Sequence, residues 1–251
     1  MTTPFVARQY SPRVQDYLSS TVHRQCADLD QIEVALKQTP AARLLDLSCG
    51  GGHPSHHAAP LVSEVVACEL TASILDTVQA TATAHGLTNV SVQQAPAEAL
   101  PFDDASFDMV IARHTTHHWR QCEVGLREAR RVLKPDGRAI FIDMIAPNDA
   151  LLDICLQTLE LLHDISHVRN YIMAKWTAAL AAAGFAIDSL TPRKLLLHVD
   201  DWVARTRTSA AHIHAIGSLQ LAGSDEVRRH FAIADDGSFT LDTLTLAAQA
   251  A

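Results

Sequence analysis

The chain has 251 residues, of which 48% are hydrophobic and 19% are charged. This composition supports a sizeable core and excludes a globally disordered protein. The formal net charge is −8 and no run of Lys or Arg occurs, so nucleic acid is not expected as a partner, because neutralising phosphates needs clustered positive charge. No stretch of about 18 apolar residues is present, so we expect no membrane span.

The N-terminal segment and the cysteines together predict a cytoplasmic protein. Residues 1–10 lack the basic region and the apolar run of a signal peptide. The five cysteines are scattered, odd in number and contain no CxxC pair, which favours reduced thiols over a disulfide framework.

Strand and helix patterns alternate along the first 145 residues. Residues 43–47 (RLLDL) form a short apolar run that ends at glycines, which predicts a buried strand. Similar runs predict strands at 64–69, 90–94, 107–112 and 138–144, with helices between them. Alternation in this order predicts an α/β fold, a Rossmann-like doubly wound and mostly parallel sheet. Its ligand crevice is expected at the carboxyl ends of the strands.

The pattern changes after residue 145. Helices are expected at 151–163, 173–183 and 200–231, a strand interrupted by Pro192 at 186–199, and an antiparallel or edge strand at 238–246. We therefore predict a single domain over 1–251 with an antiparallel C-terminal strand and a helical cap. Its core would comprise about 40–145 and 185–250, and its cap 1–35, 146–175 and 200–232.

A glycine-rich turn, Asp46 to Gly52 (DLSCGGG), follows the first strand. Glycines let a ligand approach the backbone closely, and free N–H groups can face that ligand. Glu69 ends the second strand, where an acid can accept hydrogen bonds from ribose hydroxyls. The turn and the acid together predict a nucleoside-containing ligand. The GxxxxGK[ST] and GxGxxG patterns are absent, which argues against nucleoside triphosphates and dinucleotides.

Four sequence blocks in this order resemble a known family. Residues 44–52 resemble the first motif of class I S-adenosylmethionine-dependent methyltransferases, and residues 95–102 (APAEALPF), 105–108 (ASFD) and 131–137 (RVLKPDG) resemble its later blocks. The most similar branch is that of the ubiquinone and menaquinone biosynthesis methyltransferases. The resemblance covers about residues 40–145. It implies methyl transfer from S-adenosylmethionine, which leaves S-adenosylhomocysteine, to an oxygen, carbon or nitrogen of a small-molecule acceptor.

The resemblance also implies roles for matching positions. Asp46, Ser48 and Gly50 would line the methionine end of the cofactor. Glu69 would hold the ribose hydroxyls. The remaining expected cofactor contacts are Leu70, Pro96 and Ala97 near the adenine, Arg113 near the transferred methyl, and Tyr17 in an N-terminal segment that closes the site. Ser48, Gly51, Pro96 and Asp136 depart from the usual motif residues, which keeps open a fold that binds the cofactor but has lost or changed methyl transfer.

Three histidines, His114, His117 and His118, follow the fourth strand and are the candidate catalytic residues. An imidazole can accept a proton near neutral pH, so His117 or His118 could deprotonate or orient an acceptor. The alternative is that His117 or His118 caps a helix or packs in the core and has no chemical role. His56 and His57 are adjacent and point to different helix faces, so no metal site is expected.

Three further points stay open at this stage. Tyr171 and Lys175 match the YxxxK spacing of nicotinamide-dependent oxidoreductases, but the dinucleotide loop that motif requires is absent. The late helical segment, with Arg205, Arg207 and His212, could cap the crevice and select substrate, although a solvated helix face is the commoner outcome. Oligomeric state is not determined, a homodimer being one option.

Overall fold

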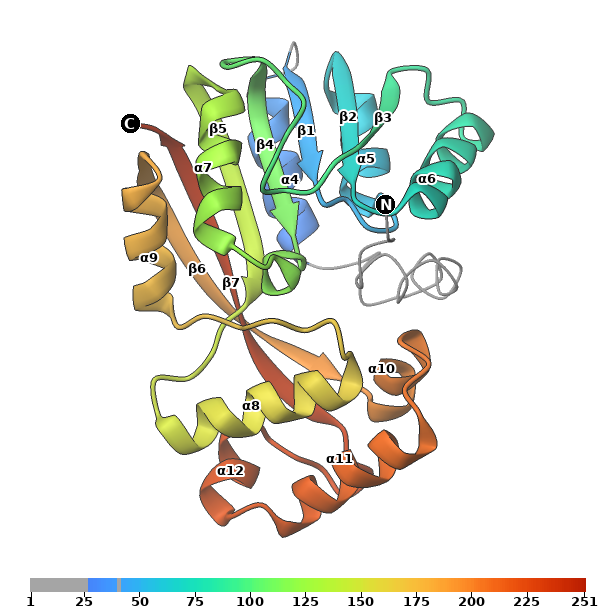
Figure 1. Cartoon of the computed structure of the whole chain (residues 1–251), viewed down its shortest axis with the longest axis vertical. Helices are drawn as coiled ribbons and strands as arrows, with labels where there is room; N and C mark the ends of the chain where they lie inside the picture. The colour runs from blue at the N-terminus through green and yellow to red at the C-terminus, as the bar shows by residue number, and fades with distance from the viewer. Residues whose placement is uncertain (1–26, 40–41) are drawn as a thin grey trace.

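The computed structural model describes residues 27–39 and 42–251, and its centre is a seven-stranded sheet in the order β3-β2-β1-β4-β5-β7-β6 (Figure 1). The strands are β1 (Arg43–Leu47), β2 (Glu64–Glu69), β3 (Val90–Gln94), β4 (Phe107–Arg113), β5 (Leu133–Met144), β6 (Phe185–Leu197) and β7 (Phe239–Ala250). Strands β1 to β5 pair in parallel, whereas β7 pairs antiparallel with both β5 and β6. The predicted doubly wound, mostly parallel sheet with an antiparallel C-terminal strand is confirmed.

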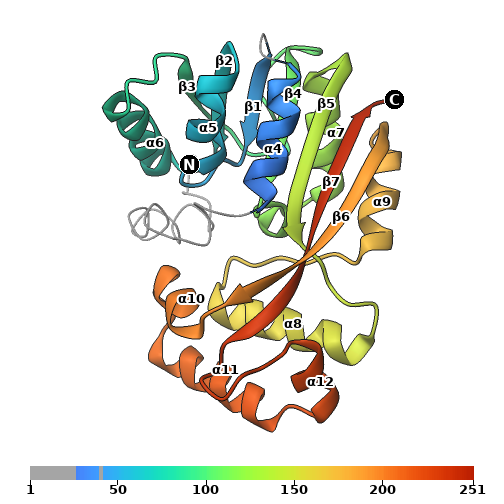
Figure 2. The ribbon, with the colours of Figure 1, turned by 180° about the vertical axis from the view of Figure 1, so that it is seen from behind.

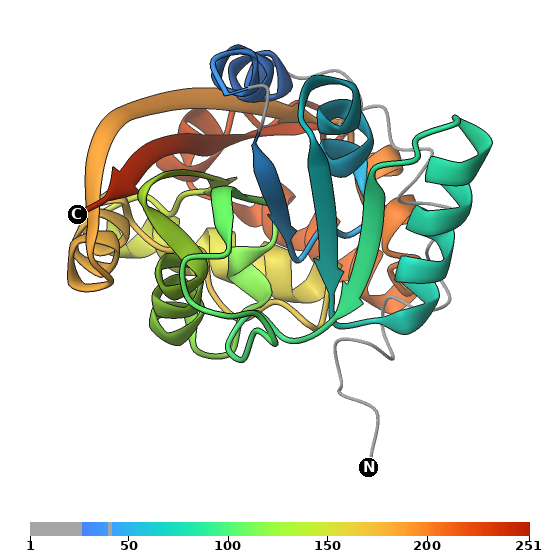
Figure 3. The ribbon, with the colours of Figure 1, turned by 90° about the horizontal axis from the view of Figure 1, so that it is seen from above.

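Helices cover both faces of this sheet. The helices α7 (Cys122–Val132) and α9 (Met173–Ala182) lie on one face, and α4 (Ala27–Lys37) and α5 (His53–Ala58), with the short η2 (Ala59–Leu61), lie on the other (Figures 1 and 2). Helix α6 (Ala72–Ala84) packs at the β2–β3 edge, as the view from above shows (Figure 3). Because the central strands are covered on both sides, they consist of near-continuous apolar runs.

The β6–β7 ribbon extends beyond the sheet. Pairing of β5 with β7 ends at Met144 opposite Thr243, but pairing of β6 with β7 continues to Leu197 opposite Phe239. Strand β6 is an edge strand, so Pro192, which has no N–H to donate, is tolerated within it rather than interrupting it.

A cap surrounds the far end of this ribbon, next to the carboxyl ends of the parallel strands (Figure 1). It consists of α8 (Ala150–His163), α10 (Val199–Arg205), α11 (Ala210–Ala222) and α12 (Asp225–His230). The cap has its own buried cluster, which includes Leu156, Trp202, Ile216, Phe231 and Phe239. The single long helical pattern at 200–231 is therefore three helices.

Two boundaries differ from the sequence expectation. Residues 27–35 were assigned to the cap, but they lie in α4, whose Leu29, Ile32 and Leu36 are buried against the sheet. Those apolar residues recur at helical spacing, and the sheet face supplies the surface that buries them. Strand β5 begins at Leu133 rather than residue 138, since Leu133 pairs with Phe107 before a register shift. No helix in the described part of the chain is both long and apolar enough to span a bilayer.

Candidate active site

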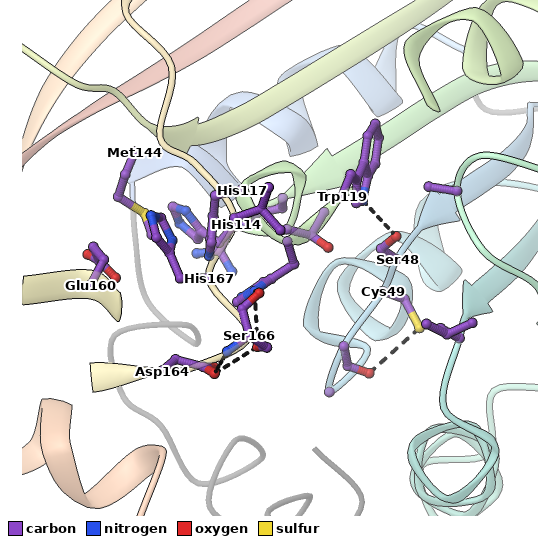
Figure 4. Close-up of a pocket in the computed structure, with 18 of the residues that line it drawn as sticks. Ser48, Cys49, His114, His117, Trp119, Met144, Glu160, Asp164, Ser166 and His167 are labelled. Atoms are coloured by element: carbon purple, nitrogen blue, oxygen red, sulfur yellow. Dashed lines mark hydrogen bonds between the residues drawn. The ribbon is translucent and has the colours of Figure 1, made fainter. Parts of the chain in front are cut away.

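A cavity of about 680 Å³ is lined by residues at the carboxyl ends of the strands and by residues of the cap. Its walls come from the turn after β1, the ends of β2, β3 and β4, the segment 164–168 and the inner side of the cap (Figure 4). This volume is in the range of small-molecule and cofactor sites. The expected crevice at the strand ends is therefore present.

The glycine-rich turn owes its shape to left-handed backbone. Ser48 and Gly50 have φ angles of 56° and 51°. A Cβ atom added at Gly50 would meet nothing within 4 Å, so the backbone there borders open space inside the cavity. Trp119 holds Ser48 in place, because the Trp119 Nε1–H donates to the Ser48 Oγ at 3.1 Å (Figure 4).

Glu69 lies buried at the end of β2 and lines the cavity. Its Oε2 accepts from the Gly50 amide at 3.4 Å, and its Oε1 accepts from the Leu70 and Thr71 amides at 2.8 and 3.2 Å. Burial raises the pKa of Glu69, although these amides oppose the shift. The carboxylate thus connects the glycine turn with the start of α6.

Asp46 differs from the sequence expectation because it does not line the cavity. Its side chain is 1% exposed and its Oδ2 accepts from the Ser55 hydroxyl at 2.5 Å. Burial raises the pKa of Asp46 to about 6. Asp46 therefore stabilises the glycine-rich turn from the protein interior, because Ser55 belongs to α5, the helix that follows this turn.

Most other expected cofactor residues do line the cavity. Leu70, Pro96, Ala97 and Arg113 are all part of its wall. The Arg113 guanidinium, however, is buried and pairs with Asp28 on α4, with Nε 2.8 Å from Oδ2. Tyr17 lies outside the described residues.

His117 forms a buried pair with Asp143 at the end of β5. Its Nδ1–H donates to Asp143 Oδ1 at 2.6 Å, which leaves Nε2 as the nitrogen with a lone pair in the neutral ring. Burial is the largest single effect and opposes the charged imidazolium, but Asp143, with smaller effects of Glu160 and Asp164, raises the pKa of His117 overall. The same attraction holds the pKa of Asp143 well below its usual range despite burial.

The other two candidate histidines have different surroundings. His118 lies against His117, with ring centroids 4.1 Å apart, and its Nδ1 is 3.2 Å from the Ser166 carbonyl oxygen. Burial lowers the pKa of His118 to about 4, so it stays neutral near pH 7. His114 has a φ of 52° and its Nε2 lies 3.4 Å from Asp28. All three line the cavity. His114 and His117 both face a carboxylate, but His117 makes the shorter contact, and its pKa is raised whereas that of His114 is lowered by burial. The His117–Asp143 pair is therefore the arrangement typical of a general base.

Sequence reasoning missed several residues of this cavity. Asp143 is the acid in the apolar strand segment RAIFIDM, and an acid at the carboxyl end of a parallel strand is a usable signal. Glu160 and His163 are polar residues on the buried apolar face of α8, and such an interruption is a weaker sequence signal. Asp164 and His167 had no signal of their own. Tyr171 and Lys175, the YxxxK residues, lie apart from this cavity.

The wall formed by β1, β2 and β3 fits S-adenosylmethionine. A buried carboxylate lies at the end of β2, and the backbone at Gly50 is open to an approaching ligand. Ala97 adds an apolar surface beside the end of β3. These are the groups that a ribose, a methionine chain and an adenine require.

Comparison with known proteins gives the family. A model of the methyltransferase domain matches residues 45–141. The uncharacterised protein YafE of Escherichia coli (strain K12) is 44% identical over 200 residues, which cover 80% of this chain and 97% of YafE. The uncharacterised methyltransferase YcgJ of Bacillus subtilis (strain 168) is 32% identical over 224 residues, covering 89% and 88% of the two chains.

Structural and more distant matches agree. The crystal structure of YcgJ superposes with a TM-score of 0.84 over 88% of this chain and 97% of that chain. The ubiquinone/menaquinone biosynthesis C-methyltransferase of Shewanella frigidimarina is 32% identical over 143 residues, covering 55% of this chain and 56% of that protein. The chain therefore belongs to the S-adenosylmethionine-dependent methyltransferases.

Proposed function

We propose that this protein transfers the methyl group of S-adenosylmethionine to a small-molecule acceptor, with His117 as the proton acceptor and Asp143 as its partner. The observation that carries the proposal is the buried 2.6 Å contact between His117 Nδ1 and Asp143 Oδ1, in the wall of the cavity that also contains the glycine turn. A cavity enclosed by a cap favours a small acceptor over a macromolecule.

The residues at the strand ends would hold the cofactor. Glu69 offers a carboxylate to the ribose hydroxyls, and the open backbone at Gly50 allows close approach of the methionine part. S-adenosylmethionine supplies a methyl group on a sulfonium, which is already activated for nucleophilic attack. The protein mainly has to align the two reactants and exclude water, which can account for about 7–11 kcal/mol of a barrier.

His117 would manage the proton of the acceptor. The acceptor atom gains a methyl group and loses a proton, and that proton passes to Nε2 of His117. Asp143 orients the ring through Nδ1 and stabilises the imidazolium that forms. Asp143 is itself held by Thr116, whose hydroxyl donates to Oδ2. General base catalysis of this kind contributes roughly 10²–10⁴-fold.

Calorimetric titration with S-adenosylmethionine, S-adenosylhomocysteine and NADH tests the cofactor part. We expect micromolar binding of the first two and none of NADH. Glu69→Ala should weaken both at least tenfold. Glu64→Ala is the matched control, because Glu64 begins the same strand and lies away from the cavity. Equal binding by both variants would contradict the role of Glu69.

A screen of small-molecule acceptors with isotope-labelled methyl donor tests the transfer. We expect labelled product with at least one acceptor and a loss of about 100-fold or more in His117→Gln. Tight binding of S-adenosylhomocysteine without any labelled product would favour the second reading of the sequence, a fold that binds the cofactor but has lost or changed methyl transfer.

A further inference from the structure

The cap end of the cavity, beyond His117, has a composition of its own. Its walls are largely apolar and come from β5, the ends of β6 and β7, and α10: Met144, Leu195, Leu197, Trp202 and Leu241. Polar side chains are few there, and they come from α8, the segment after it and α10: Glu160, His163, Asp164 and Arg205. An apolar chamber with a few convergent polar groups is typical of a specific small-molecule pocket.

Among the described residues, Arg205 has no anionic partner. It lies half-buried at the last residue of α10 and lines the cavity. No carboxylate of the described residues lies within ion-pairing distance of its guanidinium, whereas Arg113, another arginine of the wall, pairs with Asp28. Partial burial of an unpaired charge costs free energy, so an anionic ligand would stabilise Arg205. A planar carboxylate matches the two parallel N–H donors of a guanidinium.

Glu160 lines the same cavity and is influenced by the charge of Arg205. Its side chain is 4% exposed, and its Oε1 has no hydrogen-bond partner among the described residues. Burial raises the pKa of Glu160 to about 7, against the opposing effects of His117 and Arg205, so a large fraction carries a proton near neutral pH. A protonated carboxyl group donates a hydrogen bond and does not repel an incoming anion.

The remaining polar groups at this end do not supply the missing anion. His163 Nε2 lies 2.9 Å from the Trp202 carbonyl oxygen, and the two rings stack with centroids 4.0 Å apart. Burial keeps the pKa of His163 well below its ordinary value, so the ring is neutral. Asp164 Oδ1 already accepts from the amide and the hydroxyl of Ser166.

We propose that the cap end of the cavity binds the carboxylate of an apolar carboxylic acid, with Arg205 as its ion-pair partner and Glu160 as a hydrogen-bond donor. The apolar walls would take the hydrocarbon part of this acid. This inference rests on the proposed function, because it names the chemical class of the methyl acceptor. It makes Arg205 a specificity residue and gives the late helical segment a role in substrate selection.

Calorimetry with matched acids and amides tests the inference. The probes are hexanoate against hexanamide and phenylacetate against phenylacetamide, each titrated at pH 6.5 into the protein with and without saturating S-adenosylhomocysteine. We expect each acid to bind at least tenfold more tightly than its amide. Arg205→Met should abolish the preference for acid over amide. Glu160→Gln should largely preserve this preference, because the Gln amide still donates a hydrogen bond. Arg229→Met is the control, since it makes the same change of charge on the exposed side of α12, and it should leave the preference intact.

The outcomes separate this inference from the function on which it rests. Unchanged affinity of Arg205→Met for S-adenosylhomocysteine would show that the variant is folded. Equal binding of acids and amides by the wild-type protein, no binding of any acid, or an acid preference that persists in Arg205→Met would each overturn the carboxylate site. Failure of S-adenosylhomocysteine itself to bind would instead overturn the proposed function.

Discussion

Asp143 accepts hydrogen bonds from four groups of the described residues, as many as a carboxylate has lone-pair sites. Its Oδ2 accepts from the Thr116 hydroxyl and the His117 amide, and its Oδ1 from His117 Nδ1 and the Met144 amide. Such saturation favours the charged form, in agreement with the lowered pKa of Asp143. A fixed charge at this position fixes the orientation and basicity of the His117 ring.

Asp143→Asn should therefore change the pH dependence of His117. A base acts in its neutral form, so the rate of methyl transfer should rise with pH through the His117 pKa, which lies above its ordinary value of 6.5. Without the carboxylate, burial dominates, the pKa falls, and the rising limb moves to lower pH. We also expect about a 100-fold or greater loss of rate.

Titration of the His117 ring by NMR measures this shift without an acceptor. His118 does not confuse the result, because burial places its pKa at about 4. Glu160 and Asp164 also raise the His117 pKa, so Glu160→Gln should give a smaller shift in the same direction. An unchanged His117 pKa in Asp143→Asn would contradict the pairing. His85→Gln, at the end of α6, is the control for losing a histidine elsewhere.

The Trp119–Ser48 hydrogen bond links the segment that carries His117 to the glycine-rich turn after β1, where we propose that the cofactor binds. A non-glycine residue at a φ of 56° costs about 1–3 kcal/mol, and the Trp119 N–H offsets part of that cost. Trp119→Phe removes one hydrogen bond worth about 1 kcal/mol, so affinity for S-adenosylhomocysteine should fall roughly fivefold.

A double-mutant cycle checks that this loss acts through Ser48. Ser48→Gly relieves the backbone strain and removes the hydroxyl, so Trp119→Phe should have little further effect in that background. The affinity for S-adenosylhomocysteine is measured by calorimetry for the wild-type protein, the two single variants and the double variant. Fully additive losses would mean that Trp119 acts on the cofactor site by another route.

At the scale of elements, α8 is the helix on which the cap end depends, since it carries Glu160 and His163. Asp149 caps it, because its Oδ1 accepts from the Leu151 and Leu152 amides at 2.9 and 3.1 Å. Asp149→Ala should lower the free energy of unfolding by about 1 kcal/mol, and Asp149→Asn by much less. Denaturant unfolding gives these values, with Asp235→Ala as an exposed control. Equal losses in Asp149→Ala and Asp149→Asn would contradict a capping role.

Sequence patterns were reliable for the elements whose signals are local. The five strands up to residue 144 were expected from short apolar runs, and they occur where predicted apart from the early start of β5. The sequence signal was poorer for α4. Its apolar spacing shows that one face of the helix is buried, but it does not show that the sheet is the surface that covers this face. Pro192 falls within β6, because an edge position removes the need for its missing N–H.

At the scale of the whole molecule, the sheet and the cap have separate cores joined by β6 and β7. Phe231 is 1% exposed in the cap cluster, and Phe107, the first residue of β4, is fully buried in the core of the sheet. Phe231→Ala should lose about 3–5 kcal/mol of local stability. We expect faster hydrogen exchange in α8, α11 and α12, with little change in β1, β2 and β4 and with S-adenosylhomocysteine still bound.

Phe107→Ala is the matched variant, since it removes the same side chain from the sheet core. It should instead accelerate exchange in β1, β4 and β5. If Phe231→Ala accelerated exchange equally in the sheet and the cap, the two cores would not be separate cooperative units.

The sequence by itself determined the half of the cavity in which we propose that the cofactor binds. The glycine turn and Glu69 are local features, and the carboxyl ends of parallel strands bring them to one edge because parallel pairing leaves no other arrangement. Only the tertiary structure decided the half that we propose for the acceptor. His117 and Asp143 are 26 residues apart and meet because β4 pairs with β5. Glu160 and Arg205 line one chamber because the β6–β7 ribbon carries the cap over the strand ends, a long-range contact that no local pattern specifies.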